Sequence, residues 1–485
     1  MNVKFVFRIV SLAILITSVF MVAPAGIAIY DGEIRNARAY IYTMLLMLII
    51  GFAMLLATRK YKSSVYAQEG VAATSLSWLS ISLFGALPFF WSGEIPNYID
   101  ALFEIISGFT TTGASILTDV ESLSRCNLYW RSFSHWLGGM GMLVFILAVI
   151  PQTKKGSGSG IYLMRAESPG PSVGKFTPHI RETALILYGI YILLTVMCVF
   201  FLMIGDMSFF ESLCTAFGTA GTGGFGIKND SIASYSSYIQ NVVCVFMFFF
   251  GINFNIYFLI ILRQFKTVFK NEELRAYILI AVTAVIAIAI NISNMYSSIG
   301  ETLKHAAFQV SSIMTTTGFS SVDFEQWPAF SKAILLLLMF IGASAGSTGG
   351  GLKVSRVILL GKNIWRTIGK TLHPRKVYIV RMDGKLVDES ICNGVDAYLA
   401  VYCAIVLLSF VLISLDGNTI GTNFSAVTAC FNNIGPGFEL VGATGNYDHF
   451  SYFSKIILSI DMLLGRLEIF PLLALMSRGL WSRKR

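Results

Sequence analysis

The stretch Ala101-Leu-Phe-Glu-Ile-Ile-Ser-Gly-Phe-Thr110-Thr-Thr-Gly-Ala-Ser115 returns in altered form as Ala306-Ala-Phe-Gln-Val-Ser-Ser-Ile-Met-Thr315-Thr-Thr-Gly-Phe-Ser320, with eight of the fifteen aligned positions identical. Each copy is semi-apolar, too short to cross a bilayer, and ends in a loop of small residues around a glycine. Two further loops have the same setting, Gly221-Thr-Gly-Gly-Phe225 and Asn433-Ile-Gly-Pro-Gly437. Internal repetition of this kind is typical of a membrane protein built from duplicated units.

The composition of the whole chain supports a membrane protein. The 485 residues are 55% hydrophobic and 13% charged, whereas soluble proteins carry roughly 25% charged residues. Apolar runs of about 20 residues, long enough to span a bilayer, recur along the chain. We predict an all-α polytopic membrane protein with ten transmembrane helices, at about 5–29, 39–58, 71–92, 132–151, 183–204, 239–262, 275–294, 330–345, 396–415 and 453–477.

Basic residues predict how the chain is oriented. The loops on one side of the spans hold 27 of the 36 lysines and arginines, which predicts an inner-membrane protein with both termini in the cytoplasm. The formal net charge of +9 is therefore a topology signal and not a sign of nucleic-acid binding. The opposite side is acidic, which indicates either a rim that attracts cations or ordinary solvated loops. Ala23-Pro-Ala25 resembles a signal-peptide cleavage site, but the first apolar run is longer than a signal peptide needs, so we expect a retained helix.

Four units of span, half-helix, loop and span account for eight of the ten crossings. We expect a pseudo-fourfold arrangement in which the half-helices and their loops are re-entrant, and in which residues 1–65 form an extra pair of helices. The four units are predicted at residues 66–155, 176–270, 271–372 and 385–485.

The loops predict a cation site. Irregular backbone cannot face lipid, because an unsatisfied amide or carbonyl group there costs several kcal/mol, so four such loops must line water or an ion path. Potassium filters use backbone carbonyl groups that replace the hydration shell of the ion, and each half-helix would point its negative end at the centre. Aligned on a central glycine, the predicted K⁺ filter residues are Thr111, Thr112, Gly113, Gly221, Thr222, Gly223, Thr316, Thr317, Gly318, Asn433, Ile434 and Gly435.

With these four loops in place, the chain resembles the TrkH-type potassium-uptake proteins of the Trk/Ktr/HKT superfamily along essentially its whole length. The two extra N-terminal spans favour TrkH over the shorter KtrB relatives. The resemblance implies potassium uptake through a gated pore, and weaker discrimination between K⁺ and Na⁺ than in tetrameric channels, because each loop keeps little beyond its glycine. It also implies a homodimer that binds a cytosolic nucleotide-binding ring, TrkA.

The eighth span is interrupted by a glycine-rich segment in which a helix is unstable, since each glycine costs about 1 kcal/mol. The resemblance implies that this segment is a gate beneath the filter; close helix packing is the alternative. The predicted gate loop is Gly342, Ala343, Ser344, Ala345, Gly346, Ser347, Thr348, Gly349, Gly350 and Gly351.

Arg466 lies within the last span, where an ionisable residue is expected to have a function. The resemblance implies that its charge is a barrier in the pore. The alternative is an ion pair with Asp461 or Glu468, neither of which is spaced for a pair within one helix.

The basic stretches 154–175 and 353–385 are either a docking surface for the ring or topology signals alone. The seven cysteines form no CxxC pair and the five histidines no HExxH, so we expect no disulfide framework and no cofactor or metal site other than K⁺ at the filter carbonyl groups.

An enzyme and an ion-coupled symporter are the two alternative functions. An enzyme is disfavoured, because Gly221-Thr-Gly-Gly-Phe-Gly226 matches the dinucleotide pattern without the strand that must precede it. An H⁺- or Na⁺-coupled symporter would need a carboxylate within the membrane, for which Asp461 and Glu468 are the candidates.

Overall fold

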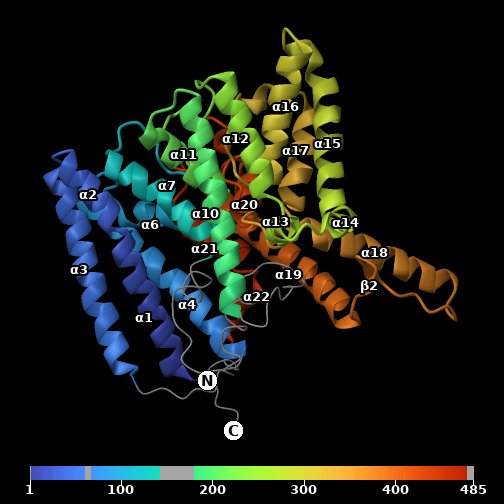
Figure 1. Cartoon of the computed structure of the whole chain (residues 1–485), viewed down its shortest axis with the longest axis horizontal. Helices are drawn as coiled ribbons and strands as arrows, with labels where there is room; N and C mark the ends of the chain where they lie inside the picture. Colours follow the sequence, from blue (N-terminus) through green and yellow to red (C-terminus); the bar gives the residue numbers. More distant parts are fainter. Residues whose placement is uncertain (1, 60–66, 142–179, 478–485) are drawn as a thin grey trace.

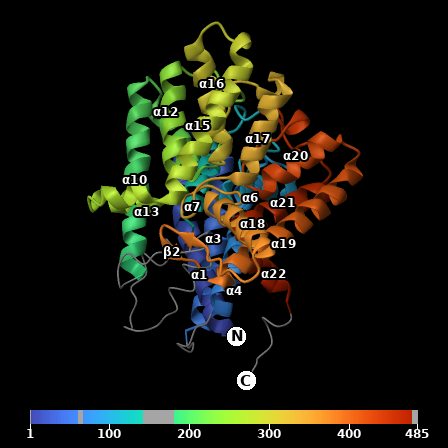
Figure 2. The same ribbon diagram turned by 90° about the vertical axis from the view of Figure 1, so that its right-hand side faces the viewer.

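The computed structural model describes residues 2–59, 67–141 and 180–477. Within these ranges the chain is helical apart from its loops and one two-stranded antiparallel sheet, β1 (Arg381–Met382) and β2 (Lys385–Leu386). The long helices stand side by side in one bundle, and the helix α18 (Val354–Leu372) extends away from it (Figures 1 and 2).

The N-terminal helices form one flank of the bundle (Figure 1). Helix α1 (Val3–Phe20) continues into α2 (Val22–Tyr30), and α3 (Ile34–Ala57) returns beside them. Helix α1 also packs against α4 (Ala67–Gly85), which is followed by α5 (Leu87–Ser92). The extra N-terminal pair therefore lies against the first long helix of the repeated region.

The rest of the bundle contains four similar units. Each has a long helix, then a short helix of 12–16 residues, a loop, and a second helix of 13–15 residues. The long helices are α4, α10 (Ile180–Ile204), α15 (Glu272–Ile292) and α19 (Glu389–Ile413). The short helices are α6 (Tyr98–Phe109), α11 (Phe209–Gly221), α16 (Ile299–Met314) and α20 (Ile420–Phe431). The second helices are α7 (Arg125–Gly139), α12 (Ser237–Phe250), α17 (Ala329–Ile341) and α21 (Tyr452–Arg466).

Each short helix begins at a residue that favours this position. The side chains of Asn97, Ser208, Ser298 and Thr419 accept hydrogen bonds from backbone N–H groups of the first helical turn. Such caps satisfy groups that a helix start leaves unpaired and contribute about 1 kcal/mol each. The four starting points are thus encoded locally in the sequence.

The second helices close the four units into a ring. Each packs against the short helix of its own unit and against the short helix of the next unit. The contacts between units are α7 with α11, α12 with α16, α17 with α20, and α21 with α6. The last contact joins the fourth unit to the first, so the arrangement is cyclic.

Six of the ten predicted spans are long apolar helices in the described part of the chain. The six are Val3–Tyr30, Ile34–Ala57, Gln68–Ser92, Glu182–Ile204, Glu272–Met295 and Glu389–Asp416. The other four predicted spans correspond to the second helices, whose 13–15 residues extend only about 20–23 Å at 1.5 Å per residue. A continuous crossing needs about 30 Å. Two of these predicted spans, 239–262 and 453–477, each consist of two helices with a break between them.

The physical reasons for these breaks are local. Between α12 and α13 (Phe254–Ile261) the chain turns by 89° at residues 251–253, where Gly251 ends the helix. Between α21 and α22 (Phe470–Met476), Glu468 and Ile469 both have positive φ, which stops an α-helix of L-residues. The last residues of the predicted span 132–151 lie outside the described ranges. The remaining elements are α14 (Phe265–Lys270), η1 (Ser293–Met295), η2 (Phe324–Gln326), η3 (Ser414–Asp416) and η4 (Glu439–Val441).

Candidate functional site

All four short helices end in the same backbone turn. Just beyond each helix, a single residue takes a left-handed conformation, with φ between 54° and 60°. The next residue donates its N–H group to the carbonyl group five residues earlier, at 2.8–2.9 Å. This is the Schellman arrangement, which normally places glycine at the left-handed position. Here that position is held by Thr111, Thr222, Thr316 and Asn433. The residues that donate are Thr112, Gly223, Thr317 and Ile434.

The turn corrects the alignment of the second loop. The residue after the donor has φ of +80°, +75°, +84° and +94° in the four loops. These residues, called the ring glycines below, are Gly113, Gly224, Gly318 and Gly435. The alignment of Gly223 with Gly113 was therefore wrong by one residue, and Gly221 corresponds to Thr110. The error arose because three glycines lie within four residues there; Phe225 after Gly224, matching Phe319 after Gly318, was the signal that could have prevented it.

The ring glycines and their neighbours close a second, tighter ring. A Cβ atom added to Gly113 would lie 2.0 Å from the carbonyl oxygen of Gly223, in the second unit. A Cβ atom added to Gly224 would lie 1.9 Å from the carbonyl oxygen of Thr317. A Cβ atom added to Gly318 would lie 2.1 Å from the carbonyl oxygen of Ile434. A Cβ atom added to Gly435 would lie 2.6 Å from the carbonyl oxygen of Thr112, which completes the cycle. The four loops therefore meet one another in order, and a side chain at any ring glycine would strike the next unit.

The carbonyl groups of Thr112, Gly223, Thr317 and Ile434, called the ring carbonyls below, belong to buried residues. None of their oxygen atoms accepts a hydrogen bond from any residue in the described part of the chain. More than nine in ten buried carbonyl groups in folded proteins are paired, and leaving one unpaired costs on the order of 1–3 kcal/mol. Four equivalent exceptions at one place indicate a site for a group that binds oxygen atoms.

A buried ion pair supports the first two loops from behind. Arg131 of α7 donates to Glu104 of α6 at 2.5 Å, and both side chains are at most 3% exposed. Glu104 also accepts the N–H of Ile116, after the first loop, at 3.0 Å. Arg131 also donates to the carbonyl oxygen of Gly226 at 2.9 Å, after the second loop. This pair was not predicted from the sequence, although two oppositely charged residues in adjacent semi-apolar segments were an available signal.

His135 connects the same two loops and was missed as well. Its Nδ1 lies 2.8 Å from the carbonyl oxygen of Gly108, and its Nε2 accepts the N–H of Phe225 at 3.3 Å. A carbonyl oxygen only accepts and an amide only donates, so the ring is neutral with its proton on Nδ1. Arg131 and His135 are four residues apart and share one helix face, which the sequence could have revealed.

The glycine-rich segment 342–353 is non-helical and lies beneath the third and fourth loops. Gly350 donates its N–H to Thr316 Oγ1 at 2.7 Å. A Cβ atom on Gly350 would lie 2.4 Å from the carbonyl oxygen of Asn432, and one on Gly349 would lie 2.7 Å from that of Thr315. The interruption of the eighth span is thus where the sequence predicts it, pressed against the ends of two short helices.

Glu273 from outside the segment and Lys353 at its end hold it in place. Glu273 of α15 accepts the N–H of Ala345 at 2.6 Å and contacts Asn253 at 3.4 Å. Lys353 is buried and donates to the carbonyl oxygen of Gly349. Sequence reasoning named neither Glu273 nor Lys353 as part of the site.

Arg466 lies against the segment from the opposite side. Its Nη1 donates to the carbonyl oxygen of Thr348 at 2.8 Å, and its Nη2 to those of Gly138 and Gly139 at 2.5 and 2.7 Å. The two acids considered as partners have other contacts: Glu468 pairs with Arg356, and Asp461 accepts from Ser409 at 2.8 Å.

This architecture defines a class, the helical multi-pass membrane proteins in which repeated short helices direct their loops at a common axis. Comparison with known proteins identifies the family. Residues 36–483 match the family model TrkH, described as "Cation transport protein". The chain belongs to the TrkH family.

Similar proteins extend over the whole chain. The Trk system potassium uptake protein TrkH of Escherichia coli K12 is 36% identical and is aligned over 99% of this chain and 100% of its own length. TrkG of the same strain is 31% identical over 99% of both. The crystal structure of the potassium transporter TrkH from Vibrio parahaemolyticus is 31% identical, with a TM-score of 0.88, covering 99% of this chain and 100% of that one.

Proposed function

We propose that this chain takes up potassium ions through a channel-like pathway in the cytoplasmic membrane, and that the four loops are its selectivity filter. The observation that carries the proposal is the set of four buried ring carbonyls without hydrogen-bond donors in the described chain. Oxygen dipoles of this kind replace the hydration shell of K⁺ in potassium filters. Its relatives in Escherichia coli are named as potassium uptake proteins.

The charge arrangement around the ring favours a cation. Each short helix ends at a loop, so its partially negative C-terminal end faces the ring. In the described part of the chain, the two basic side chains that hydrogen-bond near the first two loops carry no net charge to the ring: Arg131 pairs with Glu104, and His135 is neutral. The ring itself therefore offers only backbone oxygen atoms, which suits a monovalent ion that must both enter and leave.

The segment 342–353 is the proposed gate. It lies directly beneath two filter loops, and two cationic side chains, Lys353 and Arg466, donate to its adjacent carbonyl groups at Gly349 and Thr348. Cations on the exit path repel K⁺, so this arrangement is a closed or resting state. Opening requires the segment to move together with at least one of these side chains.

Ion-coupled symport is the second candidate, and one residue favours it. Asp461 is a buried carboxylic acid whose Oδ2 has no hydrogen-bond partner among the described residues. A carboxyl group in that setting could carry a proton across the membrane. Glu468 is a weaker candidate because Arg356 already pairs with it.

A cytosolic regulatory subunit is the proposed partner, as the resemblance to Trk proteins implies, and the transporter is proposed to act as a homodimer. The surface that suits the regulatory subunit is the basic helix α18 and the hairpin β1–β2 that follows it. Residues 154–175, the other basic stretch, lie outside the described ranges. Co-purification that yields no nucleotide-binding partner would contradict the docking surface.

Transport itself is testable in proteoliposomes. With a K⁺ gradient and no other gradient, the reversal potential should follow the K⁺ equilibrium potential, and a Gly318→Ser variant should carry no current. The same chain should restore growth of a potassium-uptake-deficient bacterium at low K⁺, whereas Gly318→Ser should not. A reversal potential that shifts with a proton or sodium gradient would establish symport instead, and Asp461→Asn should then abolish the shift.

A further inference from the structure

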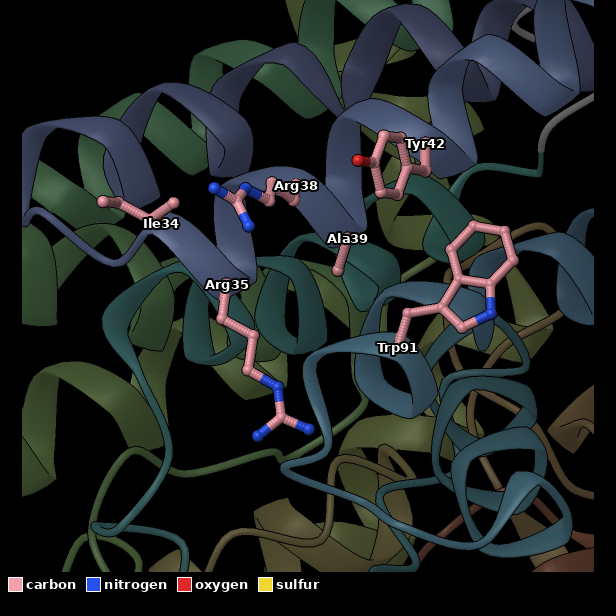
Figure 3. A pocket seen from close by; sticks show the side chains of 6 residues that line it. All are labelled: Ile34, Arg35, Arg38, Ala39, Tyr42 and Trp91. Carbon is pink, nitrogen blue, oxygen red and sulfur yellow. The ribbon is translucent and has the colours of Figure 1, made fainter.

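A pocket lies on the N-terminal flank, far along the chain from the four loops. It encloses about 500 Å³ and is lined by five residues of α3 and one of α5 (Figure 3). The lining residues are Ile34, Arg35, Arg38, Ala39, Tyr42 and Trp91. They belong to the first turns of α3 and the last turn of α5, so they lie at one end of two membrane-spanning helices.

The two arginines are unexpected at this place. Basic residues concentrate on the other side of the spans, where 27 of the 36 are found, and Arg35 and Arg38 belong to the minority that the positive-inside rule does not explain. Both are exposed. Neither forms an ion pair or a hydrogen bond with any residue in the part of the chain that the structure describes.

Nearby acids are already engaged and leave the arginines available. Asp31 pairs with Arg125 at 3.1 Å. Asn36 donates to Glu33 at 2.7 Å and to Glu94 at 2.8 Å, drawing both carboxylates together behind α3. Among the described residues, Arg35 and Arg38 are therefore left without a carboxylate partner of their own.

The side chains of the pocket fit a phosphate group at a membrane surface. Arginine binds phosphate through a planar fork of N–H donors, and Trp and Tyr are enriched at the level of lipid headgroups. Arg35 and Arg38 are three residues apart, and Tyr42 follows four residues later, so all three share one face of α3. Trp91 of α5 completes the lining on the side of Ala39 and Tyr42 (Figure 3).

The same face continues as an apolar stripe. Below the arginines it carries large apolar side chains at spacings of three and four residues, each more than half exposed. These are Tyr42, Leu45, Ile49, Phe52 and Leu56. A free phosphate ion would not use such a stripe, whereas an acyl chain would lie along it.

We propose that the pocket binds the phosphate of an anionic phospholipid, with an acyl chain lying along the exposed stripe of α3. The side of the membrane away from the basic loops would then carry a specific lipid site on the N-terminal pair. This site is separate from the ring of loops, and its occupation does not depend on transport.

Native mass spectrometry of the full-length protein in detergent tests the proposal. The protein is titrated with phosphatidylglycerol, with phosphatidylcholine, and with glycerol 3-phosphate, which has the anion without acyl chains. We expect one phosphatidylglycerol to be retained in preference to phosphatidylcholine. The variant R35Q/R38Q should bind it at least about tenfold more weakly, since two charge-assisted bonds are lost. The control K228Q/K304Q removes two charges from the same predicted side, away from α3, and should bind as the wild type does.

Three outcomes would overturn the proposal. The wild-type protein could bind phosphatidylglycerol and phosphatidylcholine equally well, a result that does not depend on whether any variant folds. Glycerol 3-phosphate could displace phosphatidylglycerol at equal concentration, which would make the pocket a site for free anions. An Ile49→Cys variant could form a disulfide-linked dimer in membranes, which would mean that a second copy of the chain covers the stripe.

Discussion

Arg466 Nη1 lies 2.8 Å from the carbonyl oxygen of Thr348, so the last broken helix is joined directly to the glycine-rich segment of the third unit. Nη2 of the same guanidinium group contacts the end of α7. One side chain thus ties the fourth unit to the third and the first at the level just beneath the ring.

Removal of Arg466 should increase resting transport. Arg466→Ala deletes a positive charge from the proposed exit path and frees the carbonyl group of Thr348, so we expect basal K⁺ flux in proteoliposomes to rise severalfold. The matched control is Arg275→Ala, an exposed arginine at the start of α15, which should leave flux unchanged. Equal flux in wild type and Arg466→Ala would refute the barrier.

The corrected register makes Gly224 as critical as Gly318. Gly224→Ala would place a Cβ 1.9 Å from the carbonyl oxygen of Thr317 at a φ of +75°, so we expect K⁺ uptake to fall below detection. Gly226→Ala is the neighbouring control, because its nearest contact would be 3.3 Å and its φ is not positive. Uptake assays in a potassium-uptake-deficient strain compare the two; normal uptake by Gly224→Ala would contradict the register.

Glu104 should matter for stability more than any exposed charge. Glu104→Ala leaves Arg131 buried and without its carboxylate, which typically costs about 3–5 kcal/mol, and it also loosens the first loop. The pair Arg366–Glu389, whose carboxylate side chain is 69% exposed, is the comparison, and Glu389→Ala should cost less than about 1 kcal/mol. Thermal unfolding in detergent measures both, and equal midpoints would rule out the supporting role of Glu104.

Glu273 should keep the proposed gate ordered. Glu273→Ala removes the acceptor for the N–H of Ala345, so backbone amides in 342–353 should exchange hydrogen faster and basal K⁺ flux should increase. Glu272→Ala is a suitable control, since Glu272 pairs with Lys362 on the neighbouring surface. Unchanged exchange in 342–353 would show that other contacts are sufficient to hold the segment.

Much of the fold follows from local signals in the sequence. The long apolar helices, the two similar stretches 101–115 and 306–320, and the interruption after Ile341 are encoded by hydropathy, repetition and glycine content. The breaks after α12 and after α21 were not predicted, because apolar residues continue across them and each break depends on single positions such as Gly251 and Glu468. Hydropathy averages over about 20 residues and cannot detect such a point.

The four loops of the candidate site were identified from the sequence, but the residues that hold the loops in place were not. Thr112, Thr317 and Ile434 were assigned to their places, whereas the second loop was shifted by one because its glycines are interchangeable in an alignment. The supporting roles of Glu104, Arg131, His135 and Glu273 were not predicted, since they depend on contacts between helices far apart in the sequence. Only the packed bundle brings such partners within hydrogen-bond distance.

The cyclic order of the ring glycines has an evolutionary consequence. Because the four loops are encoded at four different positions in one gene, a single substitution changes one loop and leaves the other three intact. A channel made of four identical subunits changes all four loops at once. If the loops form the proposed filter, its ion preference can therefore be adjusted in small steps, and the positions of the ring carbonyls already hold three residue types, threonine at 112 and 317, glycine at 223 and isoleucine at 434.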